Sequence, residues 1–303
     1  DPEQLPPVVD GPDDEPSDIL SEPTATLATV MRQPEGGLLD AAMQIRGGGI
    51  LSHGKSTDGR FTYLDSRDNS FDRSVLFNLI QSHDVILVAR NQMRLLMNDL
   101  YRRISGYMQS PVDFVPKPGE KLIAISRYSN QKKSSPTILN GDYLEVESFN
   151  NRIITRNSNS EDDDLVPADF KVTLSHREGQ DGSKSKPFEA ILPYQILSSD
   201  HVFGESTSTS HCTGPLTDEN NQAIKAPIVR CEWAYALTVH KAQGSQWPRV
   251  LVINDGQSTK GTSYKQWMYV ACTRATEKLT LLDLDLYTAQ QIAIDFDRSM
   301  MSA

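Results

Sequence analysis

Two short stretches near the end of the chain carry side chains suited to contacts with phosphate groups. The first, Thr238-Val-His-Lys-Ala-Gln-Gly244, supplies a hydroxyl, an imidazole and an amide. The second, Tyr269-Val-Ala-Cys-Thr-Arg-Ala275, places an arginine beside a threonine. A fixed guanidinium can neutralise the charge that develops on phosphate oxygens during phosphoryl transfer. Together the two stretches indicate nucleotide chemistry.

The elements expected around these stretches are buried strands alternating with helices. Continuous apolar runs of this length are typical of parallel strands, and apolar residues at helical spacing predict amphipathic helices. We expect strands at 84–89, 249–253 and 278–282, and helices at 27–31, 38–45, 92–104 and 267–273. The pattern predicts an α/β domain with a parallel sheet.

The middle of the chain has a different texture, in which short alternating segments are separated by turn residues. Strands are expected at 121–126, 143–149, 152–155, 170–174 and 188–193, with a hairpin dipeptide at Asn140-Gly141 and exposed loops at 161–164 and 178–186. We therefore predict an α/β domain formed by 1–115 and 231–303 and interrupted by an all-β domain, 116–230.

The composition narrows the class of protein. The 303 residues suffice for two modest domains, and the formal net charge of −10 argues against a broad basic surface for duplex nucleic acid, although a narrow single-strand track is compatible with it. Cys212, Cys231 and Cys272 show no CxxC spacing, so we expect neither a disulfide framework nor a metal site. Without a secretion signal or a membrane-length apolar run, we expect a soluble cytoplasmic protein, or one of the host-cell cytoplasm if viral.

One motif points to a different enzyme. Residues 49–56 satisfy the phosphate-binding pattern GxxxxGK[ST] with Lys55, and the strand ending at Asp255 imitates its acidic partner. A phosphate-cradling loop should leave a strand and enter a helix, whereas this loop follows a helix and enters the turn Thr57-Asp-Gly59. A complete P-loop ATPase using Lys55 is therefore the alternative and not the main hypothesis.

The two phosphate-directed stretches resemble motifs V and VI of superfamily 1 helicases, in particular the RecD-like and Dda-like branch (1B). The first residues, Asp1-Pro-Glu-Gln-Leu-Pro-Pro-Val8, resemble the end of motif III of that family. The resemblance implies a RecA-like (P-loop NTPase-type) domain 2A interrupted by a small SH3-like domain 2B. It also implies that the chain is the C-terminal portion of a helicase and starts within motif III.

The resemblance assigns ATP contacts to five residues. Arg274 matches the motif VI arginine finger, Arg32 the motif IV arginine and Gln4 the motif III glutamine that senses the γ-phosphate, and these three are the catalytic candidates. Gly244 and Gln246 fall in motif V. The family commonly has Gly-x-Glu there, with the glutamate accepting from the ribose, so Gln246 is a departure that can still accept that hydrogen bond.

The resemblance also assigns contacts to a single strand. Thr238 and His240 match motif V residues that touch its backbone, and Gln243 should link the strand to the nucleotide cleft. From the residues themselves, Asn91 and Arg94 follow an apolar strand at a helix start, where either a phosphate contact or a helix cap fits.

The function implied by the resemblance is ATP-driven movement along single-stranded DNA, 5′ to 3′, with duplex unwinding in replication, repair or recombination. ATP and Mg²⁺ would be the cofactors, with the metal held mainly by an absent N-terminal RecA-like domain, the chain's main partner besides DNA. We expect a monomer that hydrolyses no ATP alone. A non-catalytic strand-binding or partner-binding module and an RNA helicase remain open.

Overall fold

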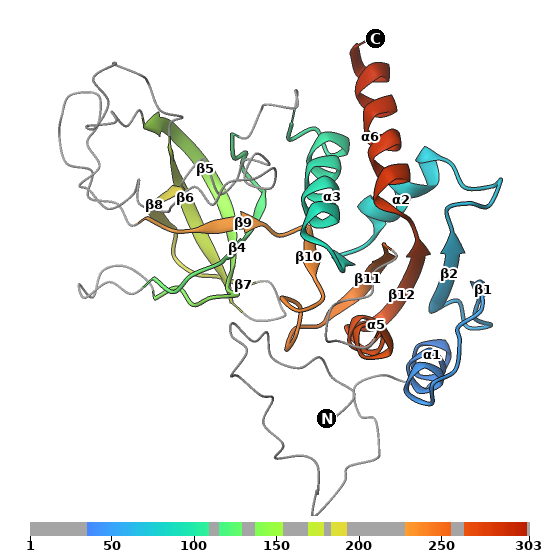
Figure 1. The fold of residues 1–303 in the computed structure, drawn as a ribbon. Coiled ribbons are helices and arrows are strands. Elements are labelled where there is room, and N and C mark those ends of the chain that lie inside the picture. The colour runs from blue at the N-terminus through green and yellow to red at the C-terminus, as the bar shows by residue number, and fades with distance from the viewer. Residues whose placement is uncertain are drawn as a thin grey trace, which may run out of the picture. The chain divides into compact units, whose positions relative to one another are not determined.

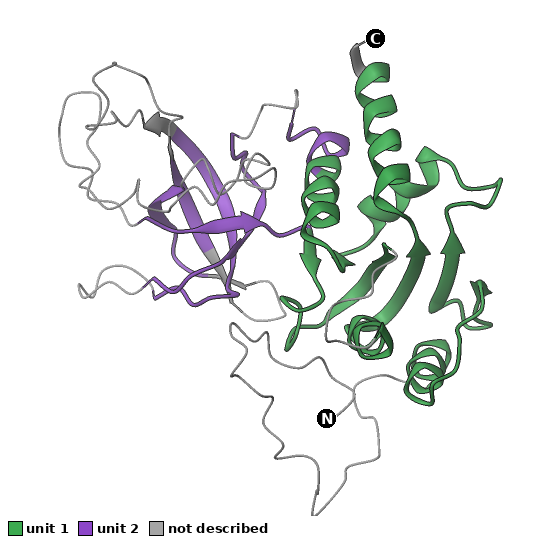
Figure 2. Ribbon diagram, viewed as in Figure 1, with its two compact units in different colours: residues 1–101, 236–303 green, residues 102–235 purple. Residues whose placement is uncertain are grey.

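The computed structural model describes residues 35–108, 115–128, 137–153, 169–178, 183–192, 228–255 and 264–301. The chain forms two compact units, 1–101 with 236–303 (unit 1) and 102–235 (unit 2), coloured separately in Figure 2. The boundaries fall inside a helix, α3 (Asn91–Ile104), and next to a short strand, β10 (Ala236–Thr238). Unit 2 is therefore inserted into unit 1. The helix expected at 27–31 lies outside the described residues.

Unit 1 is built on a six-stranded sheet with the order β1-β2-β12-β11-β3-β10. All its paired strands run parallel except β1, which forms a hairpin with β2. The strands are β1 (Gly54–Lys55), β2 (Phe61–Asp65), β3 (Val85–Val88), β10, β11 (Trp247–Asn254) and β12 (Ala275–Asp283). The predicted α/β class with a parallel sheet is confirmed.

Helices cover both faces of this sheet (Figure 1). On one face lie α1 (Gly37–Arg46) and α5 (Tyr264–Cys272), which pack against each other. On the other face are α2 (Arg73–Ser82), α3 and α6 (Leu286–Met301), with Phe77 and Phe296 in edge contact, 5.1 Å between ring centroids. Because β3 and the centre of β11 are buried from both sides, their apolar runs are continuous and do not alternate.

One buried amide closes unit 1 at the point where the chain leaves and re-enters it. Asn98, on α3, donates from Nδ2 to the carbonyl of Ala236 (3.0 Å) and accepts from the backbone N–H of the same residue (2.9 Å). The same Nδ2 also donates to the Arg94 carbonyl, and Asn98 is 1% exposed. The first residue of β10 is thereby fixed to α3.

Unit 2 is an antiparallel sheet with the order β7-β6-β5-β4-β9, and β8 pairs with β6. Its strands are β4 (Lys121–Ala124), β5 (Tyr143–Ile153), β6 (Asp169–Glu178), β7 (Ser183–Lys184), β8 (Phe188–Leu192) and β9 (Cys231–Trp233). The core comes from alternate residues, among them Leu144, Val146, Val172 and Leu174, which are fully buried. The expected all-β texture of this region is present in the described strands.

Two local expectations for unit 2 were wrong. Segment 143–149 and residues 152–153 belong to one strand, because register shifts between Val146 and Ser148 and between Phe149 and Asn151 let β5 keep its pairing with β6 across the polar residues. Residues 154–155 lie outside the described part of the chain. The expected loop at 178–186 contains β7, which continues the pairing of β6.

A buried ion pair joins the end of α3 to the first strand of unit 2. Arg102 donates from Nε to Glu120 Oε1 (2.6 Å) and from Nη2 to Oε2 (3.2 Å), and both side chains are 0% exposed. The guanidinium also lies over the Trp233 ring, 3.8 Å from its centroid, and Glu120 Oε2 accepts from the Lys117 backbone N–H. Both charges are thus compensated in the interior.

Candidate functional site

The motif V residues lie on the connection between β10 and β11. Thr238 is the last residue of β10, 9% exposed, and its carbonyl and hydroxyl accept hydrogen bonds from the Ala242 and Lys241 backbone. His240 follows in a turn, half-buried, and burial lowers the pKa of its imidazole. A neutral imidazole at physiological pH can accept as well as donate a hydrogen bond.

The same connection then crosses from one edge of the sheet to the other. Both β10 and β11 run parallel to β3, so the connection starts at the carboxyl edge at Thr238 and ends at the amino edge at Trp247. Gln243 and Gly244 are exposed on it, and Gly244 has φ +86°, a left-handed conformation that favours glycine. This course allows one segment to carry contacts at both edges.

Arg274 and Gln246 both lie at the amino edge of β11 and β12. Arg274 is 3% exposed, and its guanidinium donates to the Val270 carbonyl (2.9 Å), to the Ser245 carbonyl (3.3 Å) and to Thr273 Oγ1 (3.0 Å). Its own carbonyl accepts from the Trp247 backbone N–H (3.0 Å). The structure therefore joins the motif VI arginine directly to the motif V segment.

Gln246 is the second polar group at this edge. Its amide nitrogen, Nε2, is buried and has no hydrogen-bond partner among the described residues. An unpaired buried donor costs about 1–3 kcal/mol. Such a group is suited to a ligand that supplies an acceptor oxygen.

Asn91 and Arg94 lie at the start of α3, beyond the carboxyl end of β3. The exposed Asn91 accepts through Oδ1 from Arg94 Nε (3.2 Å), while Arg94 is 6% exposed. Val88 ends β3 opposite Thr238, so these two residues share the carboxyl edge with Thr238 and His240. Four of the residues predicted to contact the single strand, Thr238, His240, Asn91 and Arg94, thus lie at the carboxyl edge of the sheet. Arg274 and Gln246 lie at the opposite edge. Gln4 and Arg32 lie outside the described residues.

The P-loop imitation does not have the geometry that phosphate binding requires. Lys55 lies in β1, exposed, and its strand turns directly into β2 through residues 57–59. Ser56 bonds with Asp58 and with the Phe61 backbone in that turn. The loop enters a hairpin and not a helix. The N-terminus of α1 does face the turn, but the Gly37 backbone N–H there donates to Asp58 Oδ2 (2.9 Å).

Asp255, noted in the sequence only as part of that imitation, occupies an unusual place. It follows β11 at the carboxyl edge, is 2% exposed and accepts through Oδ2 from the Arg90 backbone N–H (3.2 Å). Its Oδ1 is buried without a partner among the described residues, and burial raises the pKa of the carboxyl. An acid directly after an apolar strand was the signal available in the sequence.

Part of the α/β unit, including the contact between Arg274 and Ser245, falls within a known family of domains. Residues 233–282 match the UvrD-like helicase C-terminal domain. The match contains β10, β11, α5 and Arg274, and it confirms the prediction of a superfamily 1 helicase C-terminal portion.

Particular helicases are similar to the chain in structure. The Pif1 helicase from Candida albicans aligns with 15% identity and a TM-score of 0.41, over 88% of this chain and 57% of its own. A Pif1 helicase from Bacteroides, in complex with ADP-AlF3 and ssDNA, aligns with 12% identity and a TM-score of 0.41, over 90% and 56%. The chain thus spans a little over half the length of these proteins. Among proteins of curated function, none matches the sequence.

The described helices were also compared with the requirements for crossing a membrane. None of those in the described part of the chain is long and apolar enough to do so.

Proposed function

We propose that the chain supplies the second RecA-like domain of an ATP-dependent, single-strand-translocating DNA helicase. ATP would bind between unit 1 and another RecA-like domain that carries a true Walker A motif and the ligands for Mg²⁺. Unit 2 would be the inserted domain 2B of this branch. The observation that carries the proposal is the bond from Arg274 to the Ser245 carbonyl, within the segment that matches the helicase family.

The nucleotide side of the proposed site is the amino edge of β11 and β12. Gln246 Nε2 is a buried donor without a partner among the described residues, and the ribose or phosphate oxygens of ATP would satisfy it. Arg274 would exchange bonds to backbone carbonyls for bonds to the γ-phosphate, which carries full negative charge and is the stronger acceptor. Gln4 and Arg32 keep their assigned roles in this proposal.

The strand side is the carboxyl edge of β3 and β10, where Thr238, His240, Asn91 and Arg94 lie. If Arg274 released the Ser245 carbonyl, the segment from Thr238 to Ser245, which includes Gln243 and Gly244, would be held less firmly. Nucleotide binding would in this way alter the hold on the strand. In such a switch, the nucleotide replaces an internal hydrogen bond of the protein, here the bond from Arg274 to the Ser245 carbonyl.

The test measures ATP turnover and strand binding separately. The chain alone, and the chain extended at its N-terminus by a RecA-like domain that carries a Walker A motif, are assayed for ATP hydrolysis with and without single-stranded DNA. We expect no turnover from the chain alone and DNA-stimulated turnover from the extended protein. Arg274→Ala in the extended protein should lower turnover by about 10³-fold or more. Because it also removes the bond to the Ser245 carbonyl, the variant should still bind labelled oligo(dT), but with a Kd that no longer changes when nucleotide binds.

Arg298→Ala is the matched control, because Arg298 is a surface arginine of unit 1, with a side chain 78% exposed. A Lys55-dependent ATPase in the chain alone would reject the proposal in favour of the P-loop alternative. Retention of full turnover by Arg274→Ala would reject the finger assignment. Stimulation by RNA equal to that by DNA would assign the protein to the RNA alternative.

A further inference from the structure

Three polar residues end three adjacent parallel strands at the carboxyl edge of the unit 1 sheet. Asp65 ends β2, Asp283 ends β12 and Asn254 ends β11. They are direct neighbours in register, with Asp283 opposite Asp65 on one side and opposite Asn254 on the other. The carboxyl edge of an open parallel sheet is where α/β proteins place their ligands.

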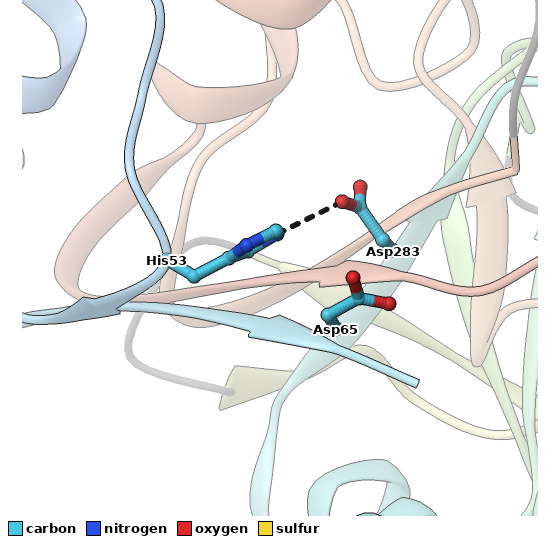
Figure 3. A group of neighbouring side chains, drawn as sticks. All are labelled: His53, Asp65 and Asp283. Atoms are coloured by element: carbon cyan, nitrogen blue, oxygen red, sulfur yellow. Dashed lines mark hydrogen bonds and ion pairs between the residues drawn. The ribbon is translucent and has the colours of Figure 1, made fainter. Parts of the chain in front are cut away.

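An imidazole reaches the same place from the segment before β1. His53 Nε2 lies 3.0 Å from Asp283 Oδ2, and its ring meets the Tyr63 ring edge-on, 4.3 Å between centroids. Figure 3 shows His53, Asp65 and Asp283 converging from the three segments. One donor atom of each lies within 4.8 Å of the other two.

We propose that His53, Asp65 and Asp283 bind a divalent transition-metal ion, with water completing its coordination. Ligand atoms of one such ion are about 2.0–2.2 Å from it, which places them within roughly 4.4 Å of one another. The ligand atoms here lie within 4.8 Å of one another, and the His53 side chain, 47% exposed, has room to move. The proposal concerns a site outside the helicase motifs.

The central ligand, Asp283, is held in place by two donors that are not ligands themselves. Tyr63 Oη donates to both carboxylate oxygens (3.0 Å each), and Asn254 Nδ2 donates to Oδ1 (2.6 Å). Carboxylate ligands oriented by such partners are characteristic of protein metal sites.

The second carboxylate, Asp65, is held by Arg67. Its oxygens accept from the Arg67 backbone N–H (2.9 Å), from Nε (2.9 Å) and from Nη2 (2.8 Å). The Arg67 side chain is 77% exposed, so its charge can remain in water when a metal ion replaces it on the carboxylate. One carboxylate is therefore paired with an exposed side chain that an ion can replace, and the other is oriented by partners that are not ligands.

The ligand set selects among ions. One imidazole with two carboxylates suits Zn²⁺, Co²⁺ or Mn²⁺, whereas Mg²⁺ prefers oxygen ligands alone. The group lies at the carboxyl ends of β2 and β12, while Arg274 and Gln246 lie at the amino ends of β12 and β11. The ion would thus be separate from any Mg²⁺ bound with ATP, and it would tie the segment before β1 to the sheet.

The test is a metal titration of the chain itself, by calorimetry with Zn²⁺ and by the visible absorption of Co²⁺. We expect one Zn²⁺ per chain, a rise of several degrees in Tm at saturation, and at least tenfold weaker binding of Mg²⁺. His53→Gln and Asp65→Asn should each weaken Zn²⁺ binding at least tenfold, while the metal-free variants keep the circular dichroism of the parent chain.

Two control variants separate this site from adventitious binding. Asp58→Asn removes an exposed carboxylate of the same hairpin, and His240→Gln removes an imidazole at another strand end, so neither should change the affinity. Binding of Zn²⁺ that survives the double variant His53→Gln/Asp65→Asn, or the absence of any binding near one equivalent, would overturn the proposal.

Discussion

The Arg102–Glu120 pair offers the sharpest test of what stabilises unit 2. Both side chains are 0% exposed and are joined by two hydrogen bonds, so replacing Glu120 by glutamine leaves a buried guanidinium without a counter-charge. Breaking a buried pair in this way costs about 3–5 kcal/mol. Because the glutamine oxygen can still accept one bond from Arg102, we expect a loss of about 3 kcal/mol.

The measurement is urea unfolding followed by a tryptophan that reports only on unit 2. Trp233 lies in unit 2, whereas Trp247 and Trp267 lie in unit 1, so Trp247→Phe/Trp267→Phe leaves a single reporter. With an m value of roughly 1.5 kcal/mol/M, a loss of about 3 kcal/mol lowers the urea midpoint by about 2 M. Far-UV circular dichroism provides a second probe, since Arg102 itself lies over the Trp233 ring.

A double-variant cycle separates the charge effect from packing. Arg102→Met should be as damaging as Glu120→Gln, because it leaves a buried carboxylate, whereas Arg102→Met/Glu120→Leu should regain most of the stability by removing both charges. A loss below about 0.5 kcal/mol for Glu120→Gln would refute the reasoning, since it would mean that the pair is not desolvated in solution.

Three further changes test unit 1. Asn98→Ala leaves both backbone groups of Ala236 without a partner and should cost about 2–4 kcal/mol in urea unfolding read at Trp247 and Trp267; a loss below about 0.5 kcal/mol would contradict this. Burial lowers the pKa of His83, so the unfolded chain binds that proton more readily, and stability should fall as the pH drops below about 6.5. In His83→Gln this acid-side slope in Tm between pH 7 and 5 should flatten, and an unchanged slope would exclude His83. Burial raises the pKa of Asp255, so its ionised form costs stability above the unfolded pKa of about 3.9, and Asp255→Asn should raise the unfolding free energy at pH 7 and not lower it.

The hydrophobic pattern of the sequence predicted the elements that have a continuous buried run or a buried stripe. The runs at 84–89, 249–253 and 278–282 became β3, β11 and β12, and the amphipathic stretch 92–104 became α3. Such elements exclude water on both faces or along one stripe, so their residue types are constrained by packing alone.

The pattern did not predict α2, β2 or α6, which are only partly buried. For two of these the caps were the available signal: Asp72 accepts from the Ser74 and Val75 backbone at the start of α2, and Asp285 accepts from the Thr288 backbone before α6. A partly buried helix with such a cap is better recognised by the residue before it than by its periodicity.

The candidate site also has a part that the sequence predicted and a part that it did not. The motifs gave Arg274 and the motif V residues, but not the bond from Arg274 to Ser245 or the orphan amide of Gln246, which depend on where α5 ends relative to β11. The convergence of His53, Asp65 and Asp283 was equally out of reach, since it follows from strand order and register, and distant segments of the chain supply its members.

The fixation of β10 to α3 by Asn98 has a consequence for how such proteins can be altered. One side chain binds both the helix from which the chain departs and the residue at which it returns, so the two junctions of the insertion are joined by groups of unit 1 alone. We expect unit 1 to accept inserts of different length and sequence between these junctions. The entropic cost of closing the inserted loop grows only slowly with the length of the insert. Grafting another small β-domain between these junctions would keep the parallel sheet intact.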